Sequence, residues 1–159
     1  MSHKVAEILN DRRAELTGRR MTPAEGAEIT AQFQADILPP SLSDWLLSHS
    51  LIGTEFYLGE EDDESGLGVE MQWLTPQQMI SEASEAYPGI AATPLGYLPV
   101  GSCLTGSGDY YYLKPHTGDD PTLVRIPHEA ATADGELKVE SIERVSTRLG
   151  EFLRNADIG

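Results

Sequence analysis

The sequence has no Lys or Arg between Met21 and Leu113, a stretch that contains fourteen Asp and Glu. Residues 1–20 carry a net charge of +2 and residues 114–159 carry −3, so this stretch accounts for nearly all of the formal net charge of −15. The scarcity of cations argues against a nucleic-acid binder and against a membrane-binding surface, because phosphates and anionic lipids are bound by clustered Lys and Arg. Two explanations stay open: acidic adaptation for solubility, or a surface for a basic partner.

Cysteine is almost absent as well, since Cys103 stands alone. A disulfide framework is excluded within the chain, and a reducing compartment is the simplest setting. No apolar run approaches the roughly 20 residues of a membrane span, and Glu7 interrupts the apolar run Val5–Leu9 that a signal peptide would need. We therefore expect a soluble, cytoplasmic protein.

The overall composition is ordinary, with 40% hydrophobic and 23% charged residues among 159. A chain of this length buries roughly 70% of its unfolded surface, which is enough for one packed domain. Disorder is disfavoured, because it needs few apolar residues in addition to a high net charge.

Motifs of known chemistry are also missing. Gly106–Gly108 is followed by Asp109 and not by the Lys of a phosphate loop, so we expect a turn there. The histidines show no metal-ligand spacing with Cys103, and His128-Glu129 lacks the second His of a zinc-protease helix. We predict no cofactor, no metal and no enzymatic activity. An enzyme would require Cys103, His128 and Asp109 to converge in a deep pocket.

Two capping boxes specify helix starts, at Thr22-Pro23-Ala24-Glu25 and at Thr75-Pro76-Gln77-Gln78. Apolar spacing predicts further helices over residues 4–17 and 41–50 and a closing helix over residues 142–153. Trp45 and Trp73 are candidate core residues.

The remaining segments read as strands, with strand-like composition or alternation. They are residues 54–58, 68–74, 97–100, 109–113, 123–126 and 136–139. Pro99 suggests that its strand lies at a sheet edge or near a strand end. In Asp109–Leu113, Tyr110 and Tyr112 should share one face and Tyr111 the other. The order predicts an α+β domain with a mixed, largely antiparallel sheet and helices packed on it.

Residues 60–64 form a run of five carboxylates, which we interpret as a solvated loop or a contact for a basic partner. An EF-hand numbered from Glu61 would place Gln72 at the twelfth position, which needs a bidentate carboxylate. Loose binding of a divalent ion by this loop stays an alternative.

Several segments, in their order and spacing, resemble the SUKH superfamily, which includes bacterial immunity proteins and a fungal regulator of cell-wall synthesis. They are Leu38–Leu47, Tyr97–Gly101, Gly108–Leu113, Leu123–Glu129 and Val145–Leu153. The resemblance implies a SUKH-like α+β domain over residues 38–159, preceded by a helical extension over residues 1–37 that packs on it.

It also implies a non-enzymatic role in binding and neutralising a toxin, often a nuclease or a deaminase. In that role an acidic surface would meet the basic groove of the toxin domain. The predicted partner-binding residues are Glu55, Glu60, Glu61, Asp62, Asp63, Glu64, Asp109 and Tyr111. The alternative is a regulatory or scaffold module with an intracellular protein partner, as in the fungal relatives. The sequence leaves the oligomeric state open.

Overall fold

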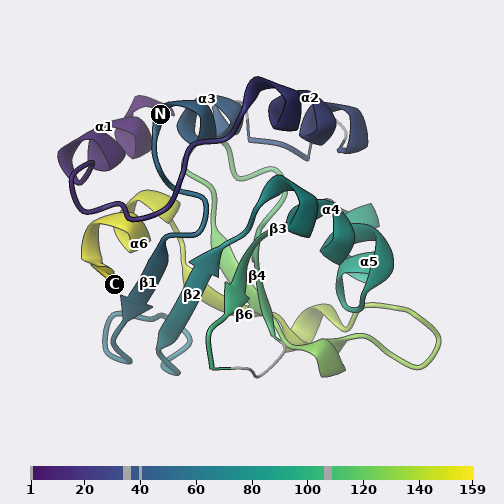
Figure 1. The fold of residues 1–159 in the computed structure, drawn as a ribbon. Coiled ribbons are helices and arrows are strands. Elements are labelled where there is room, and N and C mark those ends of the chain that lie inside the picture. Colours follow the sequence, from purple (N-terminus) through teal and green to yellow (C-terminus); the bar gives the residue numbers. More distant parts are fainter. Residues whose placement is uncertain (1, 34–36, 40, 106–108) are drawn as a thin grey trace.

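The structure is a computed structural model that describes residues 2–33, 37–39, 41–105 and 109–159. It contains a seven-stranded sheet in the order β6-β5-β4-β3-β2-β1-β7, in which every described strand pair is antiparallel (Figure 1). The strands are β1 Glu55–Leu58, β2 Val69–Trp73, β3 Leu98–Cys103, β4 Tyr110–Leu113, β5 Leu123–Ile126, β6 Glu143–Ser146 and β7 Asp157–Ile158. The predicted α+β class is confirmed, and the sheet is more uniform than the mixed sheet expected.

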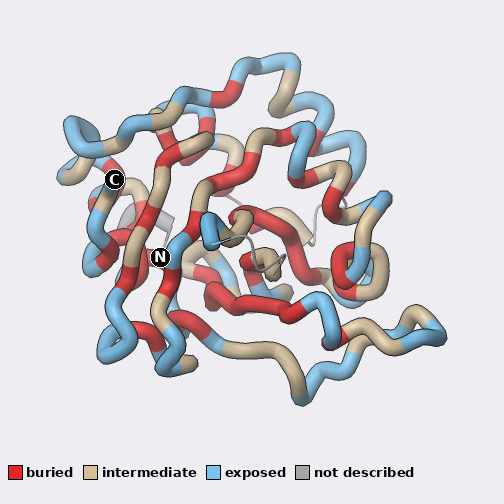
Figure 2. The backbone as a smooth tube through the Cα atoms, turned by 60° about the horizontal axis from the view of Figure 1, so that its bottom comes forward, coloured by how far each residue is buried: buried red, intermediate tan, exposed pale blue. Residues whose placement is uncertain are grey.

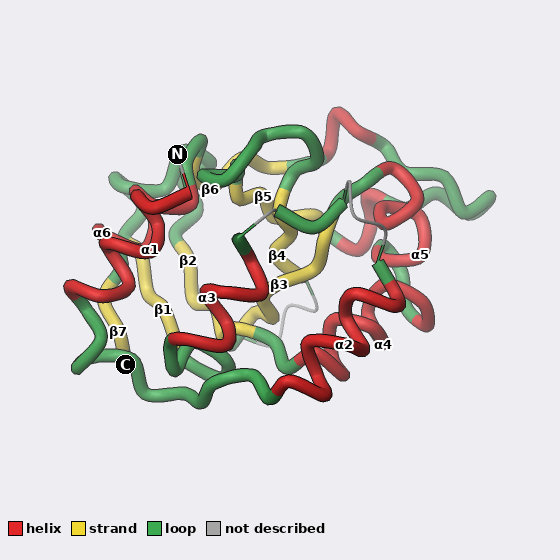
Figure 3. Tube along the Cα trace, turned by 90° about the horizontal axis from the view of Figure 1, so that it is seen from above, coloured by secondary structure: helices red, strands yellow, loops and turns green. Residues whose placement is uncertain are grey.

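The six α-helices found in the described part of the chain gather around this sheet, and α1, α3 and α2 lie across it in the view from above (Figure 3). They are α1 Ser2–Asp11, α2 Pro23–Gln32, α3 Leu42–Ser48, α4 Pro76–Glu85, α5 Gly89–Ala92 and α6 Leu149–Asn155. Both capping boxes form, with Thr22 and Thr75 each accepting a hydrogen bond from the backbone three residues on. None of the described helices is both long and apolar enough to cross a membrane.

The main core lies between these helices and the sheet, and strands and helices supply its buried residues in equal measure; Figure 2 shows buried stretches distributed along the whole chain trace. Trp45 and Trp73 are both buried in it, as predicted. The rings of Phe56 on β1 and Phe152 on α6 lie 5.6 Å apart and join the sheet to the last helix.

The first 37 residues contribute to that same core through Val5, Ile8, Ile29 and Phe33. Gly18 packs against the segment that leads into β1, and its N–H donates to Ser50 O at 3.1 Å. The two backbones lie so close that a Cβ on Gly18 would be 2.0 Å from Ile52 O. The extension is thus built into the packing of the domain.

One side chain ties the first helix to the last. The Arg12 guanidinium donates hydrogen bonds to carbonyl oxygens at the end of α6, including Leu153 O at 2.7 Å. Those carbonyls have no partner within their own helix, and a cation at a helix C-terminus is favourable.

Three element predictions are corrected by the structure. The first helix ends at Asp11 and not at residue 17. Residues 143–146 form the edge strand β6 and not the first turn of the closing helix. In an extended chain i and i+3 side chains lie on opposite faces, and here both are covered, since Val145 packs in the main core and Ile142 against the smaller cluster. Residues 139–141 form a 3-10 turn, and the strand expected over 136–139 is reduced to a single bridge at Leu137.

The strand that contains Pro99 is central and lies between β2 and β4, so an edge position is wrong. Pro99 is its second residue, and the described pairing with β2 begins only at Gly101, next to a register shift between β3 and β4. A proline without an N–H is tolerated there, because that part of the strand has no described ladder partner on the β2 side.

Candidate acidic cleft

A cleft of about 550 Å³ opens at one end of the sheet, beside the connection between β1 and β2. The end of β3 and residues of β4 and β5 form the rest of its lining. The described residues that line it are Leu58, Gly59, Glu60, Glu61, Leu67, Gly68, Val69, Glu70, Cys103, Thr105, Asp109, Tyr111 and Arg125. Glu60, Glu61 and Asp109, three of the predicted partner-binding residues, therefore meet at one concave surface although up to 49 positions separate them in the sequence.

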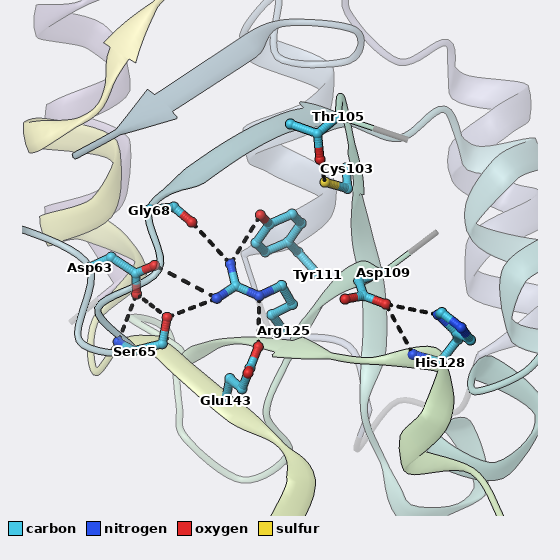
Figure 4. Close-up of polar contacts among 10 residues, drawn as sticks. All are labelled: Asp63, Ser65, Gly68, Cys103, Thr105, Asp109, Tyr111, Arg125, His128 and Glu143. Atoms are coloured by element: carbon cyan, nitrogen blue, oxygen red, sulfur yellow. Dashed lines mark hydrogen bonds and ion pairs between the residues drawn. The ribbon is translucent and has the colours of Figure 1, made fainter. Parts of the chain in front are cut away.

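Arg125 is the one basic side chain among the described lining residues, and it is only 7% exposed. Its Nε donates to Glu143 Oε1 at 2.8 Å, and its Nη2 donates to Ser65 Oγ at 2.8 Å. Its Nη1 reaches Gly68 O and Tyr111 Oη, both at 3.2 Å (Figure 4). Burial lowers the pKa of Arg125, but its hydrogen bonds and charge interactions with Glu143 and Tyr111 outweigh burial and hold the pKa above its ordinary value. The guanidinium charge is therefore paired within the protein and is not exposed to a partner.

The register of the sheet explains how Arg125 reaches these partners. Tyr111 on β4 and Glu143 on β6 are its directly opposite neighbours on the two flanking strands. Side chains at such positions share one face and interact. Arg125 thereby ties the connection between β1 and β2, which contains Ser65 and Gly68, to strand β5, next to the sheet edge.

Asp63 belongs to this buried network, so the expectation of five solvated carboxylates is corrected. It is 4% exposed, and its Oδ1 accepts hydrogen bonds from the backbone N–H and the hydroxyl of Ser65. Its Oδ2 lies 3.8 Å from Arg125 Nη2 and has no hydrogen-bond partner among the described residues. Asp63 therefore shapes the acidic loop from inside, out of direct reach of a partner.

Glu64 also serves the loop's own structure. Its carboxylate accepts hydrogen bonds from Arg144 Nε at 2.7 Å and from the backbone and hydroxyl of Thr147. Burial raises the pKa of Glu64, but these bonds outweigh burial and hold the pKa below its usual range. The loop is fastened at both Asp63 and Glu64; of its five carboxylates only Asp63 is buried, and Glu60, Glu61 and Asp62 are exposed without such bonds to the described residues.

Three further predicted residues, Tyr111, Glu55 and Asp62, do not offer a partner an exposed side chain in the cleft. Tyr111 is 1% exposed, and its ring stacks 5.5 Å from the Arg125 guanidinium, so it forms the floor and not a projecting anchor. Burial raises its pKa. Glu55 lies outside the described lining, where it accepts a hydrogen bond from Tyr57 Oη at 2.7 Å. Asp62 also lies outside the lining, although it is exposed.

Tyr111 and Tyr112 point to opposite faces of β4 and are both buried, so the alternation of side chains along the strand does not predict which tyrosine is exposed. Tyr112 is fully buried on the face opposite Tyr111, where its hydroxyl donates to Glu82 Oε2 at 2.8 Å. Both faces of the sheet are covered there, because α4 and α5 and the 127–142 connection pack beneath Tyr112. Tyr110 remains half-buried.

Two exposed apolar side chains lie in or beside the cleft, and the sequence patterns did not predict their exposure. Leu67 lines the cleft and is 61% exposed, and Leu104 follows the cleft residue Cys103 and is 37% exposed. The backbone N–H of Leu104 donates to Glu70 O, which holds the end of β3 beside β2. Arg125 was missed too, and its signal was a lone cation inside the apolar strand Leu123–Ile126, where burial requires a partner.

The alternatives of a metal-binding loop and of a catalytic cysteine can be compared with this geometry. Within the described residues, the carboxylates of residues 60–64 do not converge into a group that could hold an ion. Cys103 and Asp109 line the same cleft, and the Cys103 thiol contacts Thr105 Oγ1 at 2.9 Å.

The predicted turn at Gly106–Gly108 lies outside the described residues. Asp109, at its end, accepts a hydrogen bond from the His128 backbone N–H at 3.1 Å.

Comparisons of the chain with protein-family models, with curated proteins and with solved structures find no significant match. The resemblance to the SUKH superfamily therefore stays a prediction that rests on the sequence motifs.

Proposed function

We propose that this chain is a non-enzymatic protein-binding domain whose acidic cleft holds a basic surface of its partner. The observation that carries the proposal is the composition of the cleft. Glu60, Glu61 and Asp109 lie along it, and the single described cation in its lining, Arg125, is buried and already bonded. The cleft therefore presents the negative charge of the exposed Glu60 and Glu61, which no cation of the described lining offsets.

The exposed leucines beside the rim favour a protein over a free cation as the partner. Protein interfaces combine a desolvated apolar centre with a charged rim, and Leu67 and Leu104 supply exposed apolar surface at this end of the sheet. The negative potential of the cation-free stretch would speed encounters with a basic partner and repel nucleic acid.

The kind of partner follows from the resemblance to immunity proteins. A toxin that acts on nucleic acid has a basic substrate groove, and an acidic domain seated in it blocks access to the substrate. The contact residues in this proposal are Glu60, Glu61, Asp62 and Asp109, with Glu55 at the far end of β1 as a peripheral contact. Asp63 and Tyr111 hold the cleft in shape from within, and the exposed Glu64 fastens the loop to Arg144 and Thr147.

The first experiment uses the product of the adjacent gene as the probe and compares two triple variants. In the test variant, Glu60→Gln, Glu61→Gln and Asp62→Asn neutralise the exposed loop carboxylates. In the control variant, Glu28→Gln, Asp44→Asn and Glu136→Gln remove the same net charge at exposed positions outside the cleft lining. We expect the test variant to bind about tenfold or more weakly, and the control to bind as the wild type does. Equal affinities for the two variants would refute a role for the cleft.

Growth rescue separates immunity from regulation. If the adjacent product is a toxin, co-expression of the wild-type chain restores growth, and the test variant restores it less well than the control. Binding without any rescue would move the proposal to the alternative, a regulatory or scaffold module with an intracellular partner.

A further inference from the structure

A second cluster of polar side chains lies where β4 begins and β5 ends. Asp109 directly precedes β4, and His128 and Glu129 open the 3-10 turn that follows β5. Tyr110 and Ile126 pair across the two strands, so the register places these flanking residues side by side. Figure 4 shows the Asp109 carboxylate pointing toward the His128 ring.

Two of the three distances between the ligand-forming atoms are close to those that a tetrahedral zinc ion requires. His128 Nδ1 lies 3.1 Å from Asp109 Oδ1 and 3.6 Å from Glu129 Oε2, and one such atom from each residue falls within 4.8 Å of the others. Ligands at the usual zinc bond length of about 2.0–2.1 Å are about 3.4 Å apart in a tetrahedron. The two distances from His128 Nδ1 lie on either side of that value.

The chemistry of the donors and their surroundings also fit zinc. One imidazole nitrogen and two carboxylate oxygens suit Zn²⁺, whereas Mg²⁺ and Ca²⁺ prefer oxygen ligands alone. The His128 backbone N–H donates to Asp109 Oδ1 at 3.1 Å and helps to fix that carboxylate. The side chains of His128 and Glu129 are 61% and 71% exposed, so an ion can enter from solvent.

We propose that Asp109, His128 and Glu129 form a zinc-binding site at the edge of the acidic cleft. Three protein ligands leave one coordination position for water or for a side chain of a bound molecule. The site does not depend on the proposed partner, although Asp109 also lines the cleft and zinc there would offset part of its negative charge. Motif spacing could not indicate it, because 18 residues separate Asp109 from His128.

The test is calorimetric titration of the full chain with zinc chloride, with magnesium chloride as a second probe. We expect one equivalent of zinc to bind, a His128→Asn variant to bind it about tenfold or more weakly, and magnesium to bind much more weakly than zinc. His116→Asn is the matched control, since His116 is exposed and has a positive φ of 61° that asparagine tolerates. A Cys103→Ser variant should bind zinc as the wild type does.

Two further variants separate ligation from folding. Asp109→Asn keeps an oxygen acceptor for the His128 N–H while removing the charged ligand, and Glu129→Gln alters only an exposed side chain. Each should weaken zinc binding while the circular dichroism spectrum stays that of the wild type. Absence of zinc binding, or affinity that is unchanged in the His128→Asn variant, would overturn the proposal.

Discussion

Replacing Arg125 by methionine removes the cation that joins the acidic loop to the sheet while keeping a long apolar side chain in its place. The arginine donates four hydrogen bonds, to Glu143, Ser65, Gly68 O and Tyr111, and it is the nearest described cation to the buried Asp63 carboxylate, at 3.8 Å. The substitution therefore leaves Asp63 with an uncompensated buried charge.

The expected loss of stability follows from that burial. Removing one member of a buried ion pair costs about 3–5 kcal/mol, because the other charge stays desolvated without its partner. For a domain of this size each kcal/mol lowers the melting temperature by about 2–4 °C, so Arg125→Met should lower it by about 6–20 °C. Arg144→Met is the control, since Arg144 is 64% exposed and its pair with Glu64 is worth at most about 1 kcal/mol.

Urea unfolding followed by circular dichroism measures these losses. A double-mutant cycle with Asp63→Asn isolates the pair, because asparagine keeps the acceptor for the Ser65 N–H and removes the charge. The double variant should lose at least about 1 kcal/mol less than the sum of the two single variants. An Arg125→Met loss no larger than that of Arg144→Met, or strict additivity in the cycle, would refute the buried network as the anchor of the loop.

Two other predictions concern the buried carboxylate Glu82 and the close approach at Gly18. Burial raises the pKa of Glu82, so the native state binds its proton more tightly than the unfolded chain does. Stability should therefore fall as pH rises above the ordinary carboxyl pKa. Urea unfolding from pH 4 to 8 should show a smaller fall in the Glu82→Gln variant than in the wild type. Identical pH profiles for the two proteins would contradict this prediction. Gly18→Ala should cost about 3 kcal/mol or more, because its Cβ would lie 2.0 Å from the Ile52 carbonyl oxygen. Gly26→Ala, within α2, should be neutral or stabilising in the same urea assay, and equal effects at the two glycines would contradict the packing of the extension.

The parts of the fold that the sequence predicted well depend on local interactions. The starts of α2 and α4 follow from Thr22 and Thr75, because a capping box needs only four consecutive residues. The central position of β3 was not predictable in this way, because it is set by pairing with β2 and β4 on either side. The strand β6 was read as helix for a related reason, since its four residues are defined by pairing with β5 and not by a periodic pattern of their own.

In the candidate site, too, local sequence signals were predictive and long-range contacts were not. The loop of residues 60–64 was recognisable from its charges, and Glu60, Glu61 and Asp109 do share a cleft. The roles of Asp63 and Glu64 were not recognisable, because their partners Arg125 and Arg144 lie about 60 to 80 positions away in the sequence. Long-range ion pairs determine which carboxylates of a run are available to a partner, and composition alone does not indicate where such pairs form.

The central claim is that uncompensated negative charge at the cleft captures a basic partner, and the most direct measurement is the association rate with the adjacent gene's product at rising salt. Electrostatic steering predicts that the rate for the wild type falls steeply with ionic strength. The variant with Glu60→Gln, Glu61→Gln and Asp62→Asn should associate more slowly at low salt and lose much of this dependence, while the control with substitutions at Glu28, Asp44 and Glu136 keeps it. A wild-type rate that does not respond to salt, or an equal response in both variants, would contradict the account.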